Sequence, residues 1–377
     1  MTIKSSPTPS NTLSDEWKDV QRILAIRLDN IGDVIMLGPS LRTIHENLPG
    51  RQITLMASPV GSQAAELLPW VDDVFPWASL WQELNNRFGL DPEREFNFIN
   101  KLREEKFDAA IIFTSFSQSP YPPAYVCYLA GIPIRVGHSY EFGGGVLSHW
   151  FKPPPDGEHQ AERNLYLLKS AGFLVKDRNL SITIPAEAQK AAVGLLQNLG
   201  IKPGDSYIYF APGASAESRR YNPARSARAA TLLARDTGYP VLIAATSREA
   251  ENLKTVLDIC DGQNVISLAG KTTLAEAAAL ISGASLVVAM NSASLHIADA
   301  FQLPMVILYS GTEYLTEWEP RQSPAILLNR DVSCAPCRKF WCPYNKECLD
   351  FTPEEVLRAA VQLLSTVEVE MAKQVKL

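Results

Sequence analysis

The sequence predicts an α/β protein with two doubly wound parallel sheets, one after the other along the chain. Three observations predict this fold class. Short apolar runs rich in β-branched residues alternate with helical patterns almost throughout, as βαβ units require. A helical stretch at about residues 187–199 separates the runs into two series. The 377 residues also exceed the size at which one hydrophobic core usually stops growing, so two domains are expected.

The apolar runs predict the strands in order. The first series has strands at residues 22–28, 53–58, 72–77, 108–113 and 134–139, with a helix at about 33–47. The second series has strands at 206–212, 240–246, 264–270, 285–290 and 304–310, and a last helix runs from Thr352 to about Ser365. These runs predict a first domain over 21–180, a second over 181–350, and a C-terminal helix in 351–377 that packs back on the first domain.

Charge and the chain ends exclude several classes of protein. Residues 1–20 lack the apolar centre of a signal peptide and are expected to form a disordered tail. No later run is long enough to span a membrane, so the expected location is the cytoplasm. A net charge of −6 without a basic stripe argues against a nucleic-acid partner. No pattern indicates the oligomeric state.

The stretch RLDNIGDVIMLGPSLRTI, residues 27–44, leads from the first strand into a helix. Gly32 permits a tight turn, and Asp33 falls in the first helical turn. Ligands of doubly wound sheets bind at the carboxyl ends of the strands, and two such domains are expected to face each other across a cleft. Asp33 is therefore a helix cap or a group that faces this cleft, and the local pattern favours the cap. Asp29 could instead be the capping residue and leave Asp33 free for chemistry.

A glycine-containing loop follows the first strand of the second domain. It reads FAPGASAESRRYNP, residues 210–223. Its backbone amides, Ser215 and a guanidinium from Arg219 or Arg220 would suit an anionic diphosphate. The alternative is a solvated loop with surface arginines.

A second strand end has the same design. In VVAMNSASLHIADA, residues 287–300, a buried strand runs through Asn291, Ser292 and Ser294 straight into a helix. Free amides at such a turn would also face a ligand. His296 lies one turn inside this helix, where a histidine is more often packed than catalytic.

Phosphate-binding and nucleophile motifs of other protein classes are missing. The sequence contains no G-x-x-x-x-G-K-[ST], no G-x-G-x-x-G after the first strand and no G-x-S-x-G. A D-x-D pair, which would hold a divalent metal on a diphosphate, is absent too. Arginine, helix ends and backbone amides must then meet the charge of a diphosphate.

Four cysteines lie close together in CAPCRKFWCPYNKEC, residues 334–348. Their spacing is C-x2-C-x4-C-x5-C, and the first pair fits a structural zinc knuckle while the later gaps do not fit a standard finger. A structural zinc site and an oxidisable thiol cluster both stay open, and catalysis by these thiols is not expected. The four residues are Cys334, Cys337, Cys342 and Cys348.

Four segments in this order resemble the heptosyltransferase family, the family nine glycosyltransferases. They are ILAIRLDNIGDVIMLGPSLRTI, PGASAESRRYNPARSARAA, the run from LAGKTTLAEAAAL to VILYSGT, and the CAPC segment before TPEEVLRAAV. The resemblance covers about residues 22–366. It implies the glycosyltransferase B fold with two Rossmann-like domains, and inverting, metal-independent transfer of a sugar from a nucleotide-sugar donor. The family's typical sugar is heptose from ADP-heptose, and its acceptor is the inner core of lipopolysaccharide.

The resemblance also implies roles for individual residues. Asp33 matches the catalytic aspartate of the family's GD pair, which overturns the preference for a cap. Arg219 matches the cation that contacts the donor diphosphate, with Arg220 and Ser215 beside it. The family segment D-[ST]-G-x-x-H, which holds donor sugar and phosphate, maps onto Asn291 and His296 for the sugar and Ser292 and Ala293 for the diphosphate. Weaker matches place Glu249, Lys271 and Thr272 near the nucleoside.

Two departures from the family pattern leave the donor open. Asn291 stands where the family usually has aspartate, and Ala293 where it has glycine. Asparagine still forms hydrogen bonds but carries no charge, and the alanine methyl narrows a backbone approach to phosphate. A nucleotide-sugar epimerase of the same architecture and a retired nucleotide-binding member are the alternatives.

The acceptor is expected to be a glycolipid or oligosaccharide at the inner membrane face, where the protein would be peripheral. Two aromatic-rich segments, residues 67–81 and 139–151, bear on this expectation. They either meet an amphiphilic glycolipid there or belong to the hydrophobic core.

Overall fold

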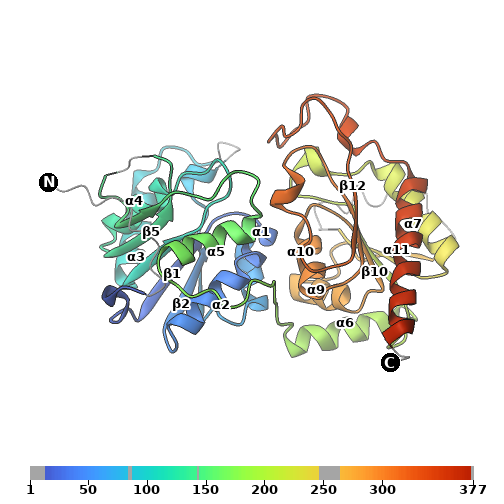
Figure 1. The fold of residues 1–377 in the computed structure, drawn as a ribbon, viewed down its shortest axis with the longest axis horizontal. Helices are drawn as coiled ribbons and strands as arrows, with labels where there is room; N and C mark the ends of the chain where they lie inside the picture. Colours follow the sequence, from blue (N-terminus) through green and yellow to red (C-terminus); the bar gives the residue numbers. More distant parts are fainter. Residues whose placement is uncertain (1–12, 84–86, 142–143, 246–263, 375–377) are drawn as a thin grey trace. The chain divides into compact units, whose positions relative to one another are not determined.

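The computed structural model describes residues 13–83, 87–141, 144–245 and 264–374. The chain divides into two compact units, Met1–Thr183 and Ile184–Leu377, and each contains one six-stranded sheet with helices on its faces (Figure 1). This boundary lies within a few residues of the expected one at 180/181. Among the described residues, no helix combines the length and the apolar character that crossing a membrane requires.

The sheet of the first unit has the strand order β3-β2-β1-β4-β5-β6, and every neighbouring pair is parallel. The strands are β1 Arg22–Arg27, β2 Gln52–Ala57, β3 Asp73–Pro76, β4 Ala109–Ile112, β5 Ile134–His138 and β6 His149–Phe151. Five of them were predicted. The prediction missed β6, because a three-residue, partly exposed edge strand has too short an apolar pattern to stand out.

The helices of the first unit are α1 Ile31–Ile35, α2 Gly38–Asn47, α3 Pro92–Glu104, α4 Tyr121–Leu129 and α5 Gln160–Ser170, with 3-10 helices at Asp15–Trp17, Gly61–Leu67 and Leu80–Gln82. The single helix predicted at 33–47 is in fact two helices. Pro39 has no N–H to donate to the carbonyl of Ile35, so α1 ends there, and Pro39 stands in the first turn of α2.

The expected disordered tail is wrong for residues 13–20. Trp17, in the first 3-10 helix, is buried, and its ring lies 5.0 Å from that of Phe173 in an edge-to-face arrangement. This apolar contact fixes the start of the described chain on the first unit. Residues 1–12 lie outside the described residues.

Aromatic side chains of the two aromatic-rich segments belong to the core of the first unit. Helices α3 and α4 pack on one face of the sheet, over Leu24 and Ile26 of β1. The ring of Trp77 stacks on Phe98 of α3 at 4.0 Å between centroids, and Phe75, Trp81 and Trp150 pack against the same cluster. For these rings the core alternative is confirmed.

The sheet of the second unit has the order β12-β11-β10-β7-β8-β9, again with parallel pairs throughout. Its strands are β7 Ile208–Ala211, β8 Val241–Ile243, β9 Val265–Ser267, β10 Leu286–Met290, β11 Met305–Leu308 and β12 Ala325–Leu328. The helices are α6 Ala186–Asn198, α7 Pro223–Thr237, α9 Leu274–Ser282, α10 Ala293–Ala300 and α11 Pro353–Gln374, with 3-10 helices at Glu217–Arg219, Leu315–Glu317 and Glu347–Leu349. The edge strand β12 was missed for the same reason as β6.

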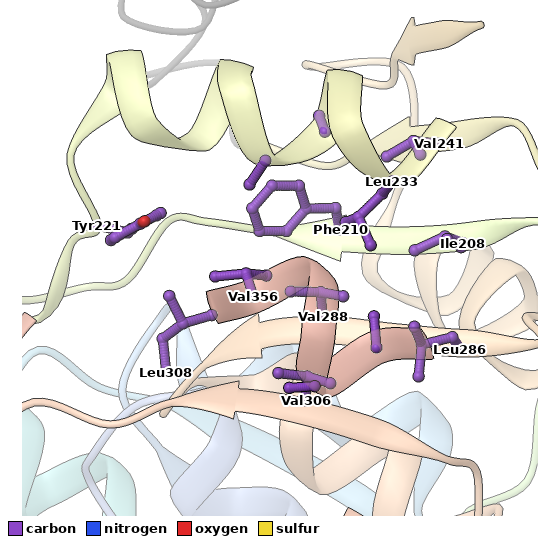
Figure 2. Close-up of a cluster of buried hydrophobic side chains, with 14 of the residues drawn as sticks. Ile208, Phe210, Tyr221, Leu233, Val241, Leu286, Val288, Val306, Leu308 and Val356 are labelled. Atoms are coloured by element: carbon purple, nitrogen blue, oxygen red, sulfur yellow. The ribbon is translucent and has the colours of Figure 1, made fainter. Parts of the chain in front are cut away.

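Helix α11 packs onto the sheet of the second unit. Figure 2 shows Val356 of this helix among the side chains of Phe210, Val288 and Leu308, which come from β7, β10 and β11. Helix α7 packs against α11 over the same core. The prediction that the C-terminal helix packs back on the first domain is therefore wrong, because its apolar face is buried in the second unit.

The order of strands reverses once in each sheet, between β1 and β4 in the first unit and between β7 and β10 in the second. All strands of a sheet point the same way, so their carboxyl ends share one edge. Crevices at such switch points are where doubly wound sheets hold ligands. We therefore expect the functional residues of each unit to lie at this edge of its sheet.

Candidate active site

Asp33 lies just beyond the carboxyl end of β1, as the third residue of α1. Its Oδ2 accepts a hydrogen bond of 3.1 Å from the backbone N–H of Asn30, the N-cap residue of this helix. Asp33 therefore does contribute to the cap, as the local pattern indicated. The alternative in which Asp29 is the capping residue is wrong, because Asn30 holds that position.

The second oxygen of Asp33 is held by Arg27, the last residue of β1. Arg27 Nη2 donates to Asp33 Oδ1 at 2.8 Å and to the hydroxyl of Ser115 at 2.6 Å. Arg27 Nε also lies 3.0 Å from Asp29 Oδ2, an ion pair that is not aligned as a hydrogen bond. The Arg27 side chain is fully buried, so one guanidinium stabilises two carboxyl groups away from water.

The charge of Asp29 is opposed by burial and favoured by its hydrogen-bond and ion-pair partners. Burial raises the pKa of Asp29, the Arg27 guanidinium lowers it, the Asp33 carboxylate raises it, and a 2.7 Å hydrogen bond from Gln118 Nε2 lowers it, in that order of importance. Arg27 carries one positive charge for two acids.

Sequence reasoning missed Arg27, Ser115 and Gln118. A signal for Arg27 was present, because an arginine at the end of a strand expected to be buried must have a charged or polar partner. Ser115 and Gln118 are 88 and 89 positions from their partners and stand in a polar loop after β4, which gave no such signal.

Further buried polar groups lie at the carboxyl ends of β4 and β5. Gln160 Nε2 donates to the carbonyl of Thr114 at 3.2 Å and to Asn164 Oδ1 at 2.9 Å. Gln160 Oε1, Asn164 Nδ2 and His138 Nε2 are buried without a hydrogen-bond partner. Burial, aided by the charge of Arg163, lowers the pKa of His138 to about 3, so this imidazole is neutral.

In the second unit a carboxylate joins two of the predicted site residues. Arg219 Nη2 donates to Glu313 Oε1 at 2.7 Å, and Asn291 Nδ2 donates to Glu313 Oε2 at 3.0 Å. The three residues follow β7, β10 and β11, which are neighbours in the sheet. Burial raises the pKa of the nearby Tyr309 phenol well above its ordinary range, and the Glu313 charge adds to that shift.

Sequence reasoning missed Glu313 as well. It stands in the polar run GTEYLTEWEP after β11, just as Asp33 stands after β1, so an acid at a strand end was the available signal. Its partners are 94 and 22 positions away in the chain.

The other residues of the Asn291 segment open helix α10. Ser292 is its N-cap residue, and its hydroxyl is buried without a hydrogen-bond partner. Ala293 is the first helical residue. His296 is buried, and its ring lies 6.5 Å from that of Trp318, which fits the packed interpretation of this histidine.

Arg220, Lys271 and Thr272, which were also predicted to contact the donor, are not part of the Arg219–Glu313–Asn291 group. Arg220 Nε donates to the carbonyl of Ala214 at 2.9 Å and Nη2 to that of Ser215 at 3.4 Å, so this guanidinium holds its own loop. Lys271 and Thr272 form the turn between β9 and α9, at the edge of the sheet opposite to β12. Glu249 lies outside the described residues.

The four cysteines of the 334–348 loop line one cavity of about 280 Å³ and form no disulfide. Burial raises the pKa of the Cys348 thiol, and the three other cysteines are near enough to add to that shift. Across the described parts of the chain, however, no three His, Cys, Asp or Glu side chains are arranged to hold a metal ion. The thiols share a cavity but are not gathered as a ligand set.

This loop is bonded to both segments that carry the arginine and the carboxylate. Ser218 Oγ, beside Arg219, donates to the carbonyl of Lys339 at 2.6 Å. The backbone N–H groups of Cys337 and Arg338 donate to Gly311 and Thr312 at 3.0 and 2.9 Å, just before Glu313. The loop is thus hydrogen-bonded to residues next to both Arg219 and Glu313.

Two doubly wound units of this kind are the fold expected for a glycosyltransferase of the B type, and comparison with known proteins identifies the family. The family model described as glycosyltransferase family 9 (heptosyltransferase) matches residues 96–347, and the chain belongs to this family.

Individual relatives agree with this assignment. The chain is 25% identical to lipopolysaccharide heptosyltransferase 3 of Escherichia coli K12 over 350 residues, which cover 88% of this chain and 95% of the relative. The crystal structure of a family 9 glycosyl transferase from Veillonella parvula has a TM-score of 0.75 at 23% identity, over 92% of this chain and 98% of that one. The structure of the E. coli ADP-heptose lps heptosyltransferase II has a TM-score of 0.72 at 22% identity, over 92% and 100% of the two chains. These structures confirm the predicted two-domain α/β fold.

Proposed function

We propose that the protein is an inverting, metal-independent heptosyltransferase, which moves heptose from ADP-heptose to the core of lipopolysaccharide or a related glycan. Membership of family 9 and the names of the relatives support this substrate pair. The observation that carries the proposed chemistry is the Asp33 carboxylate, held by Arg27 through one oxygen at the carboxyl end of β1.

Asp33 acts as the general base. It takes the proton of the acceptor hydroxyl while that oxygen forms a bond to the anomeric carbon. The bond from this carbon to the donor diphosphate breaks in the same step, and the electron pair leaves with the diphosphate. Arg27 and the Asn30 N–H fix the carboxylate, so the proton is accepted in one geometry, a contribution of about 10²- to 10⁴-fold in rate.

The second unit binds the donor. Arg219 and the amides at the start of α10, with the unpartnered hydroxyl of Ser292, offset the charge that grows on the diphosphate. Ala293 contacts the diphosphate at the same helix start, and Ser215 and Arg220 border it. Asn291 and His296 face the sugar.

The first unit binds the acceptor. Buried, unpartnered groups of Gln160 and Asn164 beside the Thr114–Ser115 strand end are neutral and suit a ligand rich in hydroxyl groups. The peripheral position at the cytoplasmic face of the inner membrane remains a prediction from the family's acceptor.

Asp33→Asn tests this function. The change keeps an oxygen for the helix cap and removes the base, so transfer from ADP-heptose should fall about 10²- to 10⁴-fold while the ADP-heptose dissociation constant stays within about twofold. Asp177→Asn, which changes an exposed carboxylate on the same unit, is the control with parental turnover. Near-parental transfer by Asp33→Asn would refute the role of Asp33 as base.

The rival functions give different products in the same assay. An epimerase converts the donor to a new sugar nucleotide without an acceptor. A retired member, which Asn291 and Ala293 would favour, binds the donor tightly and turns over none across a panel of acceptors. A thermal-shift screen with ADP-, GDP- and UDP-sugars identifies the nucleotide, because a specific ligand raises the melting temperature by mass action.

A structural zinc ion at Cys334, Cys337, Cys342 and Cys348 is a separate proposal. The shared cavity supports it, although the thiols would have to move to form a tetrahedral set. Metal analysis of the purified protein tests it, and a metal content far below one zinc per chain would contradict it.

A further inference from the structure

Glu313 has a position that the family pattern did not predict. Its two oxygens are divided between Arg219 and Asn291, and its side chain is 10% exposed. Asn291 is the position where the family usually has aspartate. A carboxylate is therefore present at this edge of the sheet after all, but it belongs to Glu313, in the loop after β11.

The chemistry of the bond fixes the orientation of Asn291. A carboxylate oxygen only accepts hydrogen bonds, so the amide must turn its nitrogen towards Glu313. An aspartate at position 291 would put a second carboxylate oxygen about 3 Å from Glu313 Oε2, the distance at which two carboxylates cannot both stay ionised. The asparagine and the glutamate thus form a matched pair.

The charges lead to the same conclusion. Arg219 and Glu313 cancel each other and the asparagine adds no charge, so these three side chains are neutral together. The charged groups of Arg338, Glu317 and Glu319 act on the same region, and all of them stay unchanged when only position 291 is varied. A second carboxylate would make the three side chains negative together and oppose a diphosphate. Because these three side chains include only one acid, Arg219 can turn from Glu313 to a diphosphate. Glu313 then still accepts its hydrogen bond from Asn291.

We propose that Glu313 supplies the carboxylate that faces the donor sugar in this protein, and that position 291 is an asparagine because Glu313 already carries the charge. This inference rests on the proposed function, since it assigns Glu313 to the donor site of that reaction. Glu313 accepts hydrogen bonds from hydroxyl groups of the donor sugar, and it orients Asn291 and Arg219.

A double-mutant cycle tests the pair. The variants are Asn291→Asp, Glu313→Gln and the double variant, and calorimetry measures the dissociation constants of ADP-heptose and ADP. Glu313→Gln should weaken ADP-heptose about tenfold and ADP by less than about twofold, because the sugar loses a charged acceptor while Arg219 stays available to the diphosphate. Asn291→Asp should weaken both ligands about tenfold, and the double variant should recover ADP-heptose binding to within about threefold of the parent.

A second readout uses the protein without ligand. Asn291→Asp should lower the urea midpoint, and the loss should grow as the pH rises from about 4 to about 7 while the two acids ionise. The double variant should lose this pH dependence. A buried residue that only fills space would show neither effect.

The outcomes separate the inference from the function on which it rests. Unchanged ADP-heptose affinity in Glu313→Gln, or additive losses in the double variant, would overturn the inference. A parent protein that binds no ADP-heptose would overturn both the proposed function and the sugar-facing role. The ligand-free cycle would still decide the charge pair, since additive losses there contradict it.

Discussion

Both units present an arginine paired with a carboxylate at the carboxyl edge of their sheet, but the two pairs differ in burial and charge. Arg27 is fully buried and shared by Asp29 and Asp33. Arg219 is 22% exposed and pairs with one carboxylate, that of Glu313, which also accepts a hydrogen bond from the uncharged amide of Asn291. The first group has two acids for one arginine, whereas the second has one acid for one arginine.

The difference shows what each pair can do. A buried cation with two acids has no solvent to compete with it, so it holds its carboxylates in place. A partly exposed, balanced pair can exchange its partner for an anionic ligand at a smaller cost. The first arrangement suits a base that is held in one position. The second suits a diphosphate site in which the ligand replaces Glu313 as the partner of Arg219.

The largest effect should come from Arg27→Met. It leaves two acids, each with a side chain that is 14% exposed, without their fully buried cation, so the free energy of unfolding should fall by about 3–5 kcal/mol in urea denaturation. Arg22→Met is the matched control on the same strand, because Arg22 is half-buried and pairs with Glu105 near the surface, and it should cost less than about 1 kcal/mol. A small loss of stability in Arg27→Met would show that water reaches the Arg27 group more readily than its burial indicates.

An intermediate effect should follow from acid. The folded-state pKa of His138, about 3, is below its ordinary 6.5, so the unfolded chain takes up the proton first. The stability due to the neutral ring is complete above about pH 6.5 and is lost towards pH 3, by up to about 1.4 kcal/mol per pH unit. His138→Gln should flatten this slope in urea denaturation between about pH 7 and pH 4.5, whereas the exposed His45→Gln should keep it. Equal slopes in the parent, His138→Gln and His45→Gln would contradict the exclusion of water from the site of the first unit.

The smallest effect on stability should come from Arg219→Met. Asn291 continues to bond Glu313, so the loss should be about 1 kcal/mol, well below that of Arg27→Met. The ADP dissociation constant should rise about tenfold, because an anion loses its cation. If this variant is as destabilised as Arg27→Met, both pairs are structural and the distinction between them is lost.

The fold could be predicted from the sequence because each core strand carries its own signal. Strand β10 is apolar from end to end and β1 is apolar between its two terminal arginines, and the alternation of such runs with helices predicts a parallel sheet. The edge strands β6 and β12 are short and half-exposed, so their pattern is weak. The course of α11 was mispredicted, since its apolar face shows only that it packs and not on which unit.

The site could be predicted only in part. Asp33 and Arg219 follow strand ends, where position alone marks them as candidates. Their partners Ser115 and Glu313 are about 90 residues away in the chain, and only the folded sheet brings them together. Arg27 was readable from its apolar surroundings, but its two acids could not be assigned to it before α1 was placed.

The 334–348 loop links the two chain segments that carry the proposed diphosphate site. Its bonds to Ser218, Gly311 and Thr312 connect the segments that carry Arg219 and Glu313. The Ser218 hydroxyl donates to the carbonyl of Lys339, 121 positions away, and the bonds to Gly311 and Thr312 join main-chain atoms. We therefore expect a substitution or oxidation in this loop to change the distance between the Arg219 guanidinium and the Glu313 carboxylate. Donor affinity should then depend on residues that never touch the donor.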